Sequence, residues 1–317
     1  MGRRAWIMLW ALASLWGASY LFIKVSLPDL GPVGVVVART ALGALVLVPI
    51  ALARGALSLP RERLGALVVL AFLQVAAPFL AISWGEERIS SSLTGILVSS
   101  APIFGALLAL WVDQEERLHG WGLAGIAIGF TGIALLFGVD LTGSAAALLG
   151  GGAVLLAGLG YAAGGLFLKH RLRGMPPVGV AAWTMVLSAA MAAPLLVLAP
   201  PGPPDAGTVA AMVGLGAGGT GVAFLIYYTL IAEVGPGRAL VVTYLAPVFA
   251  VAYGVVLLGE PITAGSVLGL VLILAGSYLA AERRLPGRRR STLPASPVPP
   301  AAPAPPSPPS SSPAPSR

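Results

Sequence analysis

Apolar segments of about 20 residues follow one another from Ala5 to Ala281, with only short gaps between them. A helix needs about 20 mostly apolar residues to cross the hydrocarbon core of a bilayer. The chain has 57% hydrophobic and 10% charged residues. An average soluble domain has roughly 45–50% and about 25%, so this chain lacks the polar side chains that a water-facing surface needs. We therefore predict an all-α membrane protein with ten transmembrane helices and no soluble domain between them.

The expected helices divide evenly between the two halves of the chain. In the first half they cover residues 5–26, 32–53, 64–84, 91–111 and 120–138. In the second half they cover residues 145–168, 177–199, 206–228, 238–258 and 263–281. Arg3 and Arg4 before the first apolar segment would suit a signal peptide, but nothing after that segment looks like a mature soluble protein. We interpret it as an uncleaved first helix.

The basic residues between the helices separate by side if the N-terminus is cytoplasmic. The outer loops then receive only Arg88, and the inner side receives Arg3, Arg4, Arg54, Arg61, Arg63, Arg117, Lys169, Arg171, Arg173, Arg238, Arg283, Arg284 and Arg288–Arg290. Basic residues favour short cytoplasmic loops. We therefore expect a prokaryotic plasma-membrane protein with both termini in the cytoplasm. The net charge of +7 reflects this topology, and no nucleic-acid partner is expected.

The composition changes to proline, serine and alanine from about Leu285. Such a segment cannot form a helix or bury a core, so residues 285–317 are expected to be a disordered cytoplasmic tail. Its basic start, Arg283–Arg290, has two readings: it binds anionic lipid headgroups, or it only anchors the last helix. Anchoring is the commoner role of such clusters.

An internal repeat relates the two halves of the chain. A shift of 145 positions places Trp16–Lys24 on Tyr161–Lys169, Pro32–Val35 on Pro177–Val180, Pro49 on Pro194 and Pro102 on Pro247. The chain contains only two lysines, and this shift pairs them. We expect one repeat over residues 1–140 and a second over 145–284. Five helices is an odd number, so the second repeat is inverted, an architecture typical of secondary transporters with a central site.

Several spaced residues agree with a known family: Trp16 and Gly17 in the first helix, Lys24 at its end, Pro102 and Pro247 midway through the fourth and ninth helices, and Glu116 and Glu260 at their ends. In their order and spacing over residues 5–284, they resemble the EamA family of the drug/metabolite transporter superfamily. The resemblance implies a central cavity lined by helices 1–4 and 6–9, with helices 5 and 10 peripheral. It also implies small metabolites, often amino acids, as substrates that are commonly moved outward. Glu115 stands where the family has the glycine seen at Gly259, so the first half departs from the family pattern at this turn.

Three basic residues within or at the ends of the expected helices are candidates for substrate contact or gating. Lys24 lies near the outer edge and Lys169 near the inner edge of the membrane, so an interfacial anchor is the alternative for both. Arg39 lies about 10 Å deep, at 1.5 Å per residue, where a charge is costly. Its repeat partner is the neutral Thr184, so Arg39 breaks the symmetry of the site. A structural pairing with Asp29 or loop carbonyls is the alternative.

The remaining candidate site residues are polar-tipped or helix-distorting: Gln74, Pro102, Tyr161, Tyr227, Tyr228, Tyr244 and Pro247. Each proline frees a backbone carbonyl that can coordinate a ligand or that merely marks a packing kink. The GxGxxG match at Gly216–Gly221 lies inside a hydrophobic helix, so we interpret it as close helix packing and not as a dinucleotide site.

No carboxylate is expected inside a helix, because Asp113, Glu116, Glu233 and Glu260 all lie at helix ends. Efflux of lipophilic cations normally uses a membrane-embedded carboxylate, so an anionic or zwitterionic substrate is favoured. The chain has no cysteine and no HExxH or GxSxG motif, and we expect no catalytic residues, no metal and no cofactor.

These observations together predict a secondary transporter that exports a small metabolite such as an amino acid by alternating access. Membrane lipids are its other partners, and its oligomeric state, monomer or homodimer, stays open. An importer of the same fold is the first alternative, which the direction of transport in oriented vesicles would distinguish. A membrane enzyme or scaffold without transport activity is the second, and it would show no substrate flux.

Overall fold

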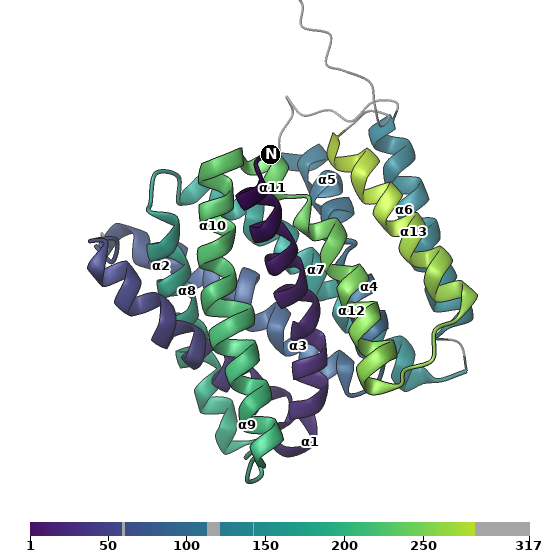
Figure 1. Ribbon diagram of the computed structural model, residues 1–317, viewed down its shortest axis with the longest axis horizontal. Coiled ribbons are helices and arrows are strands. Elements are labelled where there is room, and N and C mark those ends of the chain that lie inside the picture. Colours follow the sequence, from purple (N-terminus) through teal and green to yellow (C-terminus); the bar gives the residue numbers. More distant parts are fainter. Residues whose placement is uncertain (59–60, 113–120, 142, 283–317) are drawn as a thin grey trace, which may run out of the picture. The chain divides into compact units, whose positions relative to one another are not determined.

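The computed structural model describes residues 1–58, 61–112, 121–141 and 143–282, and these residues form helices without a β-strand (Figure 1). The expected C-terminal tail and Glu116 lie outside the described residues. The α-helices are α1 (Arg3–Ala53), α2 (Arg61–Ala71), α3 (Ala77–Glu86), α4 (Ser91–Val98), α5 (Ala101–Val112), α6 (Trp121–Val139), α7 (Ala145–Arg171), α8 (Pro177–Ala192), α9 (Ala206–Val213), α10 (Ala223–Val234), α11 (Pro236–Ala239), α12 (Val242–Leu258) and α13 (Ala264–Glu282). Three further segments are helices of other pitch: η1 (Phe72–Ala76) and η4 (Gly214–Val222) are π-helices and η3 (Ala193–Val197) is a 3₁₀ helix.

Eight helical stretches in the described part of the chain are long and apolar enough to cross a membrane. They are Arg3–Ala53, Arg61–Glu86, Ser91–Trp111, Trp121–Val139, Ala145–Arg171, Pro177–Val197, Ala206–Val234 and Ala264–Ala281, and Val242–Leu258 is a shorter apolar helix. The chain is therefore a multi-pass membrane protein, and the predicted all-α class is confirmed for the described residues.

The longest of these stretches, α1, consists of two helices joined at a break. Gly31 has φ 60° and ψ 175°, which no helical residue adopts and which costs glycine little. The break lies between the first two helices expected from the sequence, residues 5–26 and 32–53. Pro32 follows it directly and suits the first turn of the second helix, because that position has no hydrogen bond to lose.

Two helix boundaries differ from those expected in a way that matters for function. The helix expected at 64–84 extends from Arg61 to Glu86, so it contains the carboxylate of Glu86. Glu86 is the last residue of this helix, and it was not among the carboxylates predicted at helix ends. The helix expected at 91–111 is interrupted after Val98, where the amides of Ser99 and Ser100 bond to carbonyls three residues back.

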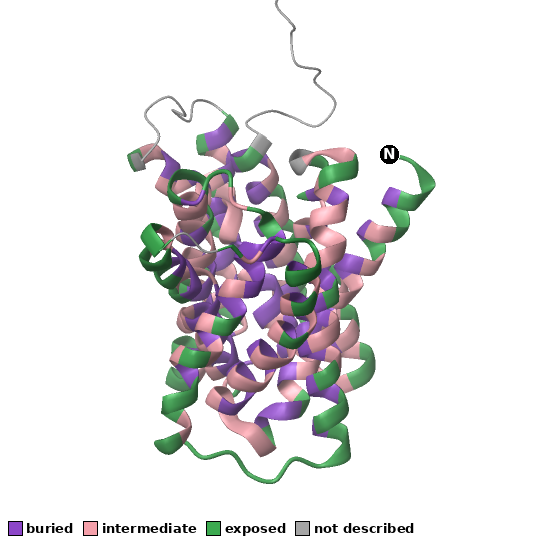
Figure 2. Cartoon of the chain, turned by 90° about the vertical axis from the view of Figure 1, so that its left-hand side faces the viewer, coloured by how far each residue is buried: buried purple, intermediate pink, exposed green. Residues whose placement is uncertain are grey.

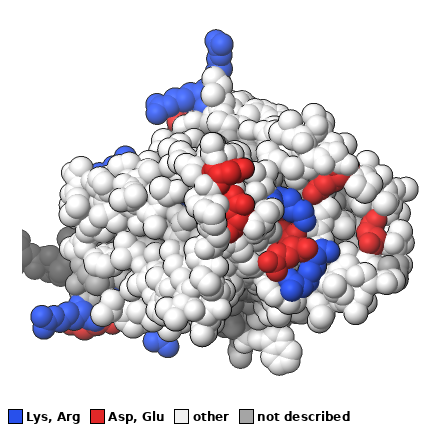
Figure 3. Space-filling view, turned by 90° about the horizontal axis from the view of Figure 1, so that it is seen from below, with Lys and Arg blue, Asp and Glu red and all other residues white. Residues whose placement is uncertain are grey.

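Buried residues concentrate along the middle of the helices, and exposed residues gather at their ends and outer faces (Figure 2). The outer faces carry large apolar side chains, such as Leu45, Val256 and Trp111, which suits a surface covered by lipid. Seen from the end away from the N-terminus, acidic and basic side chains lie next to one another among large uncharged areas (Figure 3).

Glycines allow α6 and α13 to pack at close range. A Cβ atom added to Gly125 would lie 2.5 Å from the backbone nitrogen of Ala280, and one added to Gly276 would lie 2.5 Å from that of Gly129. Distances this short leave no room for a side chain, because the neighbouring atoms belong to the backbone. The interpretation of Gly216–Gly221 as close helix packing is confirmed in the same way, because a Cβ atom added to Gly216 or Gly221 would lie 2.5 or 2.6 Å from the Cβ atom of Leu42 or Val46 in α1.

Replacing Gly276 with leucine should separate α13 from α6 and lower the melting temperature of the detergent-purified protein. Overpacking of a tight contact costs about 1–3 kcal/mol or more. Gly138 in the same helix pair has no atom within 4 Å of an added Cβ, so Gly138→Leu is the matched control and should melt close to the unmodified protein. Equal melting temperatures for the two variants would show that the contact does not hold these helices together.

Candidate functional site

A cavity of about 280 Å³ lies where helices from both halves of the chain meet. Its wall is formed by residues of α1, η1, α3, α4, α7, η4, α10 and α12, and by Ser99, which follows α4. The residues that line it are Trp16, Ser19, Tyr20, Arg39, Gln74, Phe79, Ile82, Gly95, Val98, Ser99, Tyr161, Gly219, Phe224, Tyr227, Thr243, Ala246 and Pro247. The wall is largely apolar and aromatic with few polar groups, as is usual in small-molecule sites.

Many of the lining residues are related by the repeat seen in the sequence. The same shift of 145 positions pairs Trp16 with Tyr161, Gln74 with Gly219, Phe79 with Phe224, Ile82 with Tyr227 and Val98 with Thr243, and all ten residues line the cavity. Equivalent positions of the two halves therefore face one common space. Arg39 has no such counterpart, because Thr184 at the matching position does not line the cavity.

Arg39 brings a positive charge to the cavity from the second half of α1. Its side chain is 8% exposed, its Nε donates a hydrogen bond of 3.0 Å to Thr220 Oγ1, and its Cζ lies 3.7 Å from the centroid of the Phe79 ring. In the described part of the chain, no carboxylate lies within 4.0 Å of it, and no protein acceptor is recorded for its two terminal nitrogens. The expected alternative partner, Asp29, instead accepts hydrogen bonds from Asp205 N and Thr208 Oγ1.

The helices that form the cavity wall are distorted at the cavity. The π-helix η1 contains Gln74, and the π-helix η4 contains Gly219 and Thr220. A shift of 145 positions carries Phe72–Ala76 onto residues 217–221, so the two π-helices are themselves repeat partners. The break between α4 and α5 places Ser99 at the same cavity. π-helical turns occur often at functional sites, because they redirect side chains and carbonyls that a regular helix would bury.

Five of the residues predicted from sequence meet at this cavity: Arg39, Gln74, Tyr161, Tyr227 and Pro247. Tyr227 also packs against Trp16, with 5.3 Å between ring centroids. Gln74 Oε1 is buried, and no donor to it is found among the described residues. The cavity therefore combines one cation and a neutral amide within an aromatic wall.

The other predicted residues lie elsewhere. The Thr184 hydroxyl donates to the carbonyl of Ala181, and Pro102 stands in the first turn of α5, outside the cavity lining. Tyr244 packs edge-on against Tyr278. Tyr228 stacks on Phe224 and, with Lys169, lines a separate cavity of about 420 Å³.

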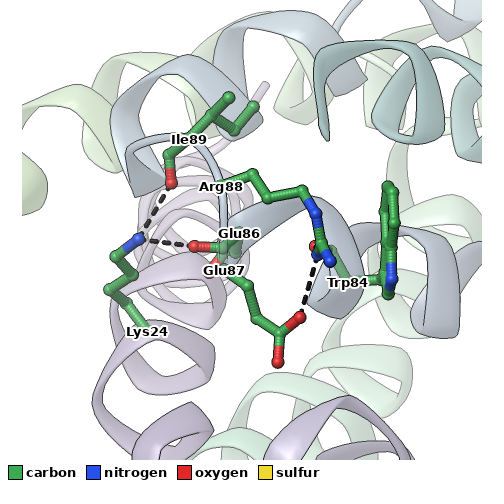
Figure 4. A network of polar contacts seen from close by, with 6 residues as sticks. All are labelled: Lys24, Trp84, Glu86, Glu87, Arg88 and Ile89. Carbon is green, nitrogen blue, oxygen red and sulfur yellow. Dashed lines mark hydrogen bonds and ion pairs between the residues drawn. The ribbon is translucent and has the colours of Figure 1, made fainter. Parts of the chain in front are cut away.

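Lys24 lies at the turn between α3 and α4, formed by Glu87–Ser90. Its Nζ donates hydrogen bonds to the backbone carbonyls of Glu86, at 2.5 Å, and Ile89, at 2.9 Å (Figure 4). Carbonyls at a helix C-terminus lack intrahelical partners and carry partial negative charge, which a cation stabilises. Lys24 therefore lies outside the cavity lining. It is also not free at the surface, as an interfacial anchor would be, because its ammonium binds the carbonyl at the end of α3.

Glu260 holds the other side of the same turn. Its carboxylate accepts hydrogen bonds from Ser91 N (2.7 Å), Ser92 N (2.9 Å) and Ser92 Oγ (2.6 Å), at the N-terminus of α4. Burial would raise the pKa of Glu260, but the hydrogen bonds from Ser92 and Ser91 outweigh it and lower the pKa below its usual 4.5. A cation and an anion from distant parts of the chain thus close the α3–α4 turn.

The contribution of Glu260 to stability should disappear in acid. Because its pKa is lower in the folded than in the unfolded protein, the contribution is complete above the usual pKa of 4.5 and is lost as the pH falls through the folded pKa. Glu260→Gln should lower the melting temperature at pH 7, and the difference from the unmodified protein should shrink below about pH 4. Glu87→Gln, on the exposed side of the turn, is the control. A constant difference across this range would contradict the assignment.

Sequence reasoning missed most of the aromatic wall and one buried acid. Tyr20, Phe79 and Phe224 line the cavity, and the repeat pairing of Phe79 with Phe224 was the signal that could have found the two phenylalanines. Glu86 is completely buried, and its position two residues beyond the expected helix end hid it. Trp84 packs against the Arg88 guanidinium, whose Cζ lies 3.5 Å from the centroid of its ring (Figure 4).

Comparison with known proteins decides the family. The model of the EamA-like transporter family matches residues 4–138 and again residues 148–281. The chain belongs to the EamA-like transporter family. It is a membrane transporter with several apolar helices, as the resemblance of its motifs predicted, and its class points to a small-molecule substrate and away from an enzyme.

Relatives of this family member span nearly its whole length. It is 28% identical over 88% of its length to a protein of Escherichia coli (strain K12) named "Probable amino-acid metabolite efflux pump", and covers 95% of that protein. It is 26% identical over 93% of its length to the "Probable terminal-alkyne amino-acid exporter" of Streptantibioticus cattleyicolor, and covers 98% of it. A crystal structure shares its fold with a TM-score of 0.64 and 21% identity, over 90% of this chain and 100% of the other.

Proposed function

We propose that this EamA protein exports small amino-acid-like metabolites, and that the substrate carboxylate binds Arg39 in the central cavity. The observation that carries the proposal is the buried guanidinium, which has one hydrogen bond to a hydroxyl and, among the described residues, no carboxylate partner. A buried cation is costly unless an anion compensates it. The planar guanidinium has two terminal nitrogens left for a carboxylate, which it can bind with two parallel hydrogen bonds.

The rest of the cavity suits the remainder of such a molecule. Its volume of about 280 Å³ lies at the lower end of ligand sites, which favours a small substrate. Aromatic rings from Trp16, Phe79 and Tyr227 offer apolar contact, and ring faces also attract an ammonium group. Relatives named as exporters of amino acids or their metabolites support both the substrate class and the outward direction.

Alternating access follows if the two halves form inverted repeats. We propose ten membrane-spanning helices, counting α1 as two and α12 as one, in repeats over residues 1–140 and 145–284. Both termini lie in the cytoplasm. The repeat-related lining residues support this arrangement, because two equivalent halves around one site can exchange conformations and open it to either side. The two separate matches to the family model support the same division.

Reporter fusions should test the orientation of the repeats. Fusions after Arg63, Arg173 and Arg284 should report the cytoplasm, and fusions near Asp29 and Arg88 should report the outside, as the distribution of basic residues requires. Paired reporters that are active on opposite sides of the membrane supply the control at each position. An outside signal after Arg173 would contradict the inverted repeat and, with it, alternating access by exchange of equivalent halves.

Transport by Arg39 variants should test the substrate site. Proteoliposomes would be assayed for counterflow with a panel of radiolabelled amino acids. Amines that match these amino acids but lack the carboxylate should not compete with them. Arg39→Gln should weaken the apparent affinity by at least about tenfold, because a hydrogen bond to a charged group contributes about 1.5–3 kcal/mol. Arg39→Lys should retain part of the activity, because the lysine ammonium keeps the positive charge but lacks the planar guanidinium that binds a carboxylate with two hydrogen bonds.

Melting temperatures of the same purified variants separate binding from structure. Arg39→Gln should not lower the melting temperature, because a neutral side chain is cheaper to bury than a charge. Arg88→Gln, at the surface beside Trp84, is the matched control and should transport normally. An unchanged affinity in folded Arg39→Gln protein would remove Arg39 from the substrate site. Absence of flux for the whole panel would contradict the proposal that amino acids are the substrates.

A further inference from the structure

Glu86 is an acid that the proposed transport site does not use. It is the last residue of α3, its exposed fraction is 0%, and both carboxylate oxygens are buried with no hydrogen-bond partner among the described residues. An ionised carboxylate in such surroundings loses its hydration without compensation, which costs several kcal/mol or more. In this conformation the group is therefore a neutral carboxylic acid.

The groups that act on Glu86 come from several elements. α1 presents Lys24, Arg39 and Tyr20, and the segment after α12 presents Glu260. From α7, Tyr161 lines the adjoining cavity, and α4 offers hydroxyls such as Ser91 but no titratable side chain. The neighbouring Glu87 and Arg88 pair with each other at 2.9 Å (Figure 4).

Lys24 connects Glu86 to the closure of the α3–α4 turn. Its ammonium donates to the backbone carbonyl of Glu86 itself, so the cation already lies beside this residue (Figure 4). While the carboxyl is protonated, the two carbonyls of the turn are the acceptors that Lys24 uses. An ionised carboxylate is the stronger acceptor and would compete for the same ammonium. Loss of the proton thus removes the cation that holds the end of α3.

We propose that the Glu86 carboxyl is a proton-binding site whose occupation keeps the α3–α4 end of the cavity closed, and whose proton passes to outside water when that end opens. In the open state the carboxylate pairs with Lys24 and is hydrated, so the charge balances. Each opening then releases one proton, and acid outside the cell favours the closed state. The link to export rests on the proposed function, whereas proton-dependent opening does not require a substrate.

A single cysteine can report the opening, because the chain contains none. Ser99→Cys places a thiol in the cavity, where the residue is 7% exposed. In the proposed topology, a membrane-impermeant maleimide added outside cells approaches it from the side of the membrane on which Arg88 and the α3–α4 turn lie. Labelling rates are compared at equal pH between Ser99→Cys alone and the same protein with Glu86→Gln. Because both proteins carry the same thiol, the effect of pH on its ionisation cancels in the ratio of the two labelling rates.

The ratio of the two rates should rise with outside pH, by up to about tenfold per unit, which is the limit for release of one proton. Glu86→Gln mimics the protonated acid, so that variant should stay closed at every pH. Glu86→Asp keeps a carboxyl and should keep the pH dependence, and Glu87→Gln is the matched control that should label like Ser99→Cys alone. Lys24→Gln, which removes the cation directly, should label fast at every pH.

A ratio that does not change with pH would overturn the proposal, and so would pH-dependent labelling that persists in Lys24→Gln. Size-exclusion chromatography confirms that each variant is folded, and Lys24→Gln keeps the test decisive if Glu86→Gln fails to fold. The result is separable from the proposed function. Flux of amino acids with a flat ratio would reject the proton site alone, whereas a rising ratio without flux would reject only the export of amino acids.

Discussion

The interior of a lipid bilayer offers no hydrogen-bond partner to a peptide group, so a chain that crosses it must satisfy its backbone internally. The described helices meet this constraint over most of their length, and several of their irregular segments lie together. The π-helices η1 and η4 and the break after Val98 all adjoin the central cavity. Irregular backbone is tolerated there because a cavity can hold water or a ligand. The position of the site is therefore set by where the helices are distorted.

Thr220 shows how such a distortion supports chemistry. Its hydroxyl donates 3.0 Å to the carbonyl of Leu215, five residues back, which is the spacing of the π-helix. The same oxygen accepts the hydrogen bond from Arg39 Nε. A hydroxyl used in both ways fixes one edge of the guanidinium and leaves the other edge to the cavity. The orientation of the Arg39 cation thus depends on the geometry of a backbone segment in the other half of the chain.

The charged side chains at the α3–α4 turn match the dipoles of the helices whose ends they contact. Lys24 meets carbonyls at the C-terminus of α3, and Glu260 meets amides at the N-terminus of α4. Each sign matches the partial charge of the helix end that it contacts. A change in the charge of Glu86, which lies beside Lys24, therefore acts directly on one of these two contacts.

The sequence predicted the all-helical class and the family well, because both rest on patterns spread over many residues. The repeat also pairs Phe79 with Phe224, two residues of the cavity wall that were not among the predicted site residues. The sequence did not predict single contacts. The acceptors of Lys24 are backbone carbonyls, which leave no mark in a sequence, and Glu86 was misplaced because helix ends depend on packing and capping rather than on hydropathy.

The contact between Arg39 and Thr220 spans 181 residues of chain. During synthesis the second helix enters the membrane long before η4 leaves the ribosome, so for that time the guanidinium lacks the hydroxyl and the enclosing wall of the second half. Water, lipid headgroups or the insertion machinery must solvate it in the meantime, since an isolated arginine in hydrocarbon is costly. The second half thus completes the folding of the first, and a first half produced alone would carry an unburied charge in its membrane-facing wall.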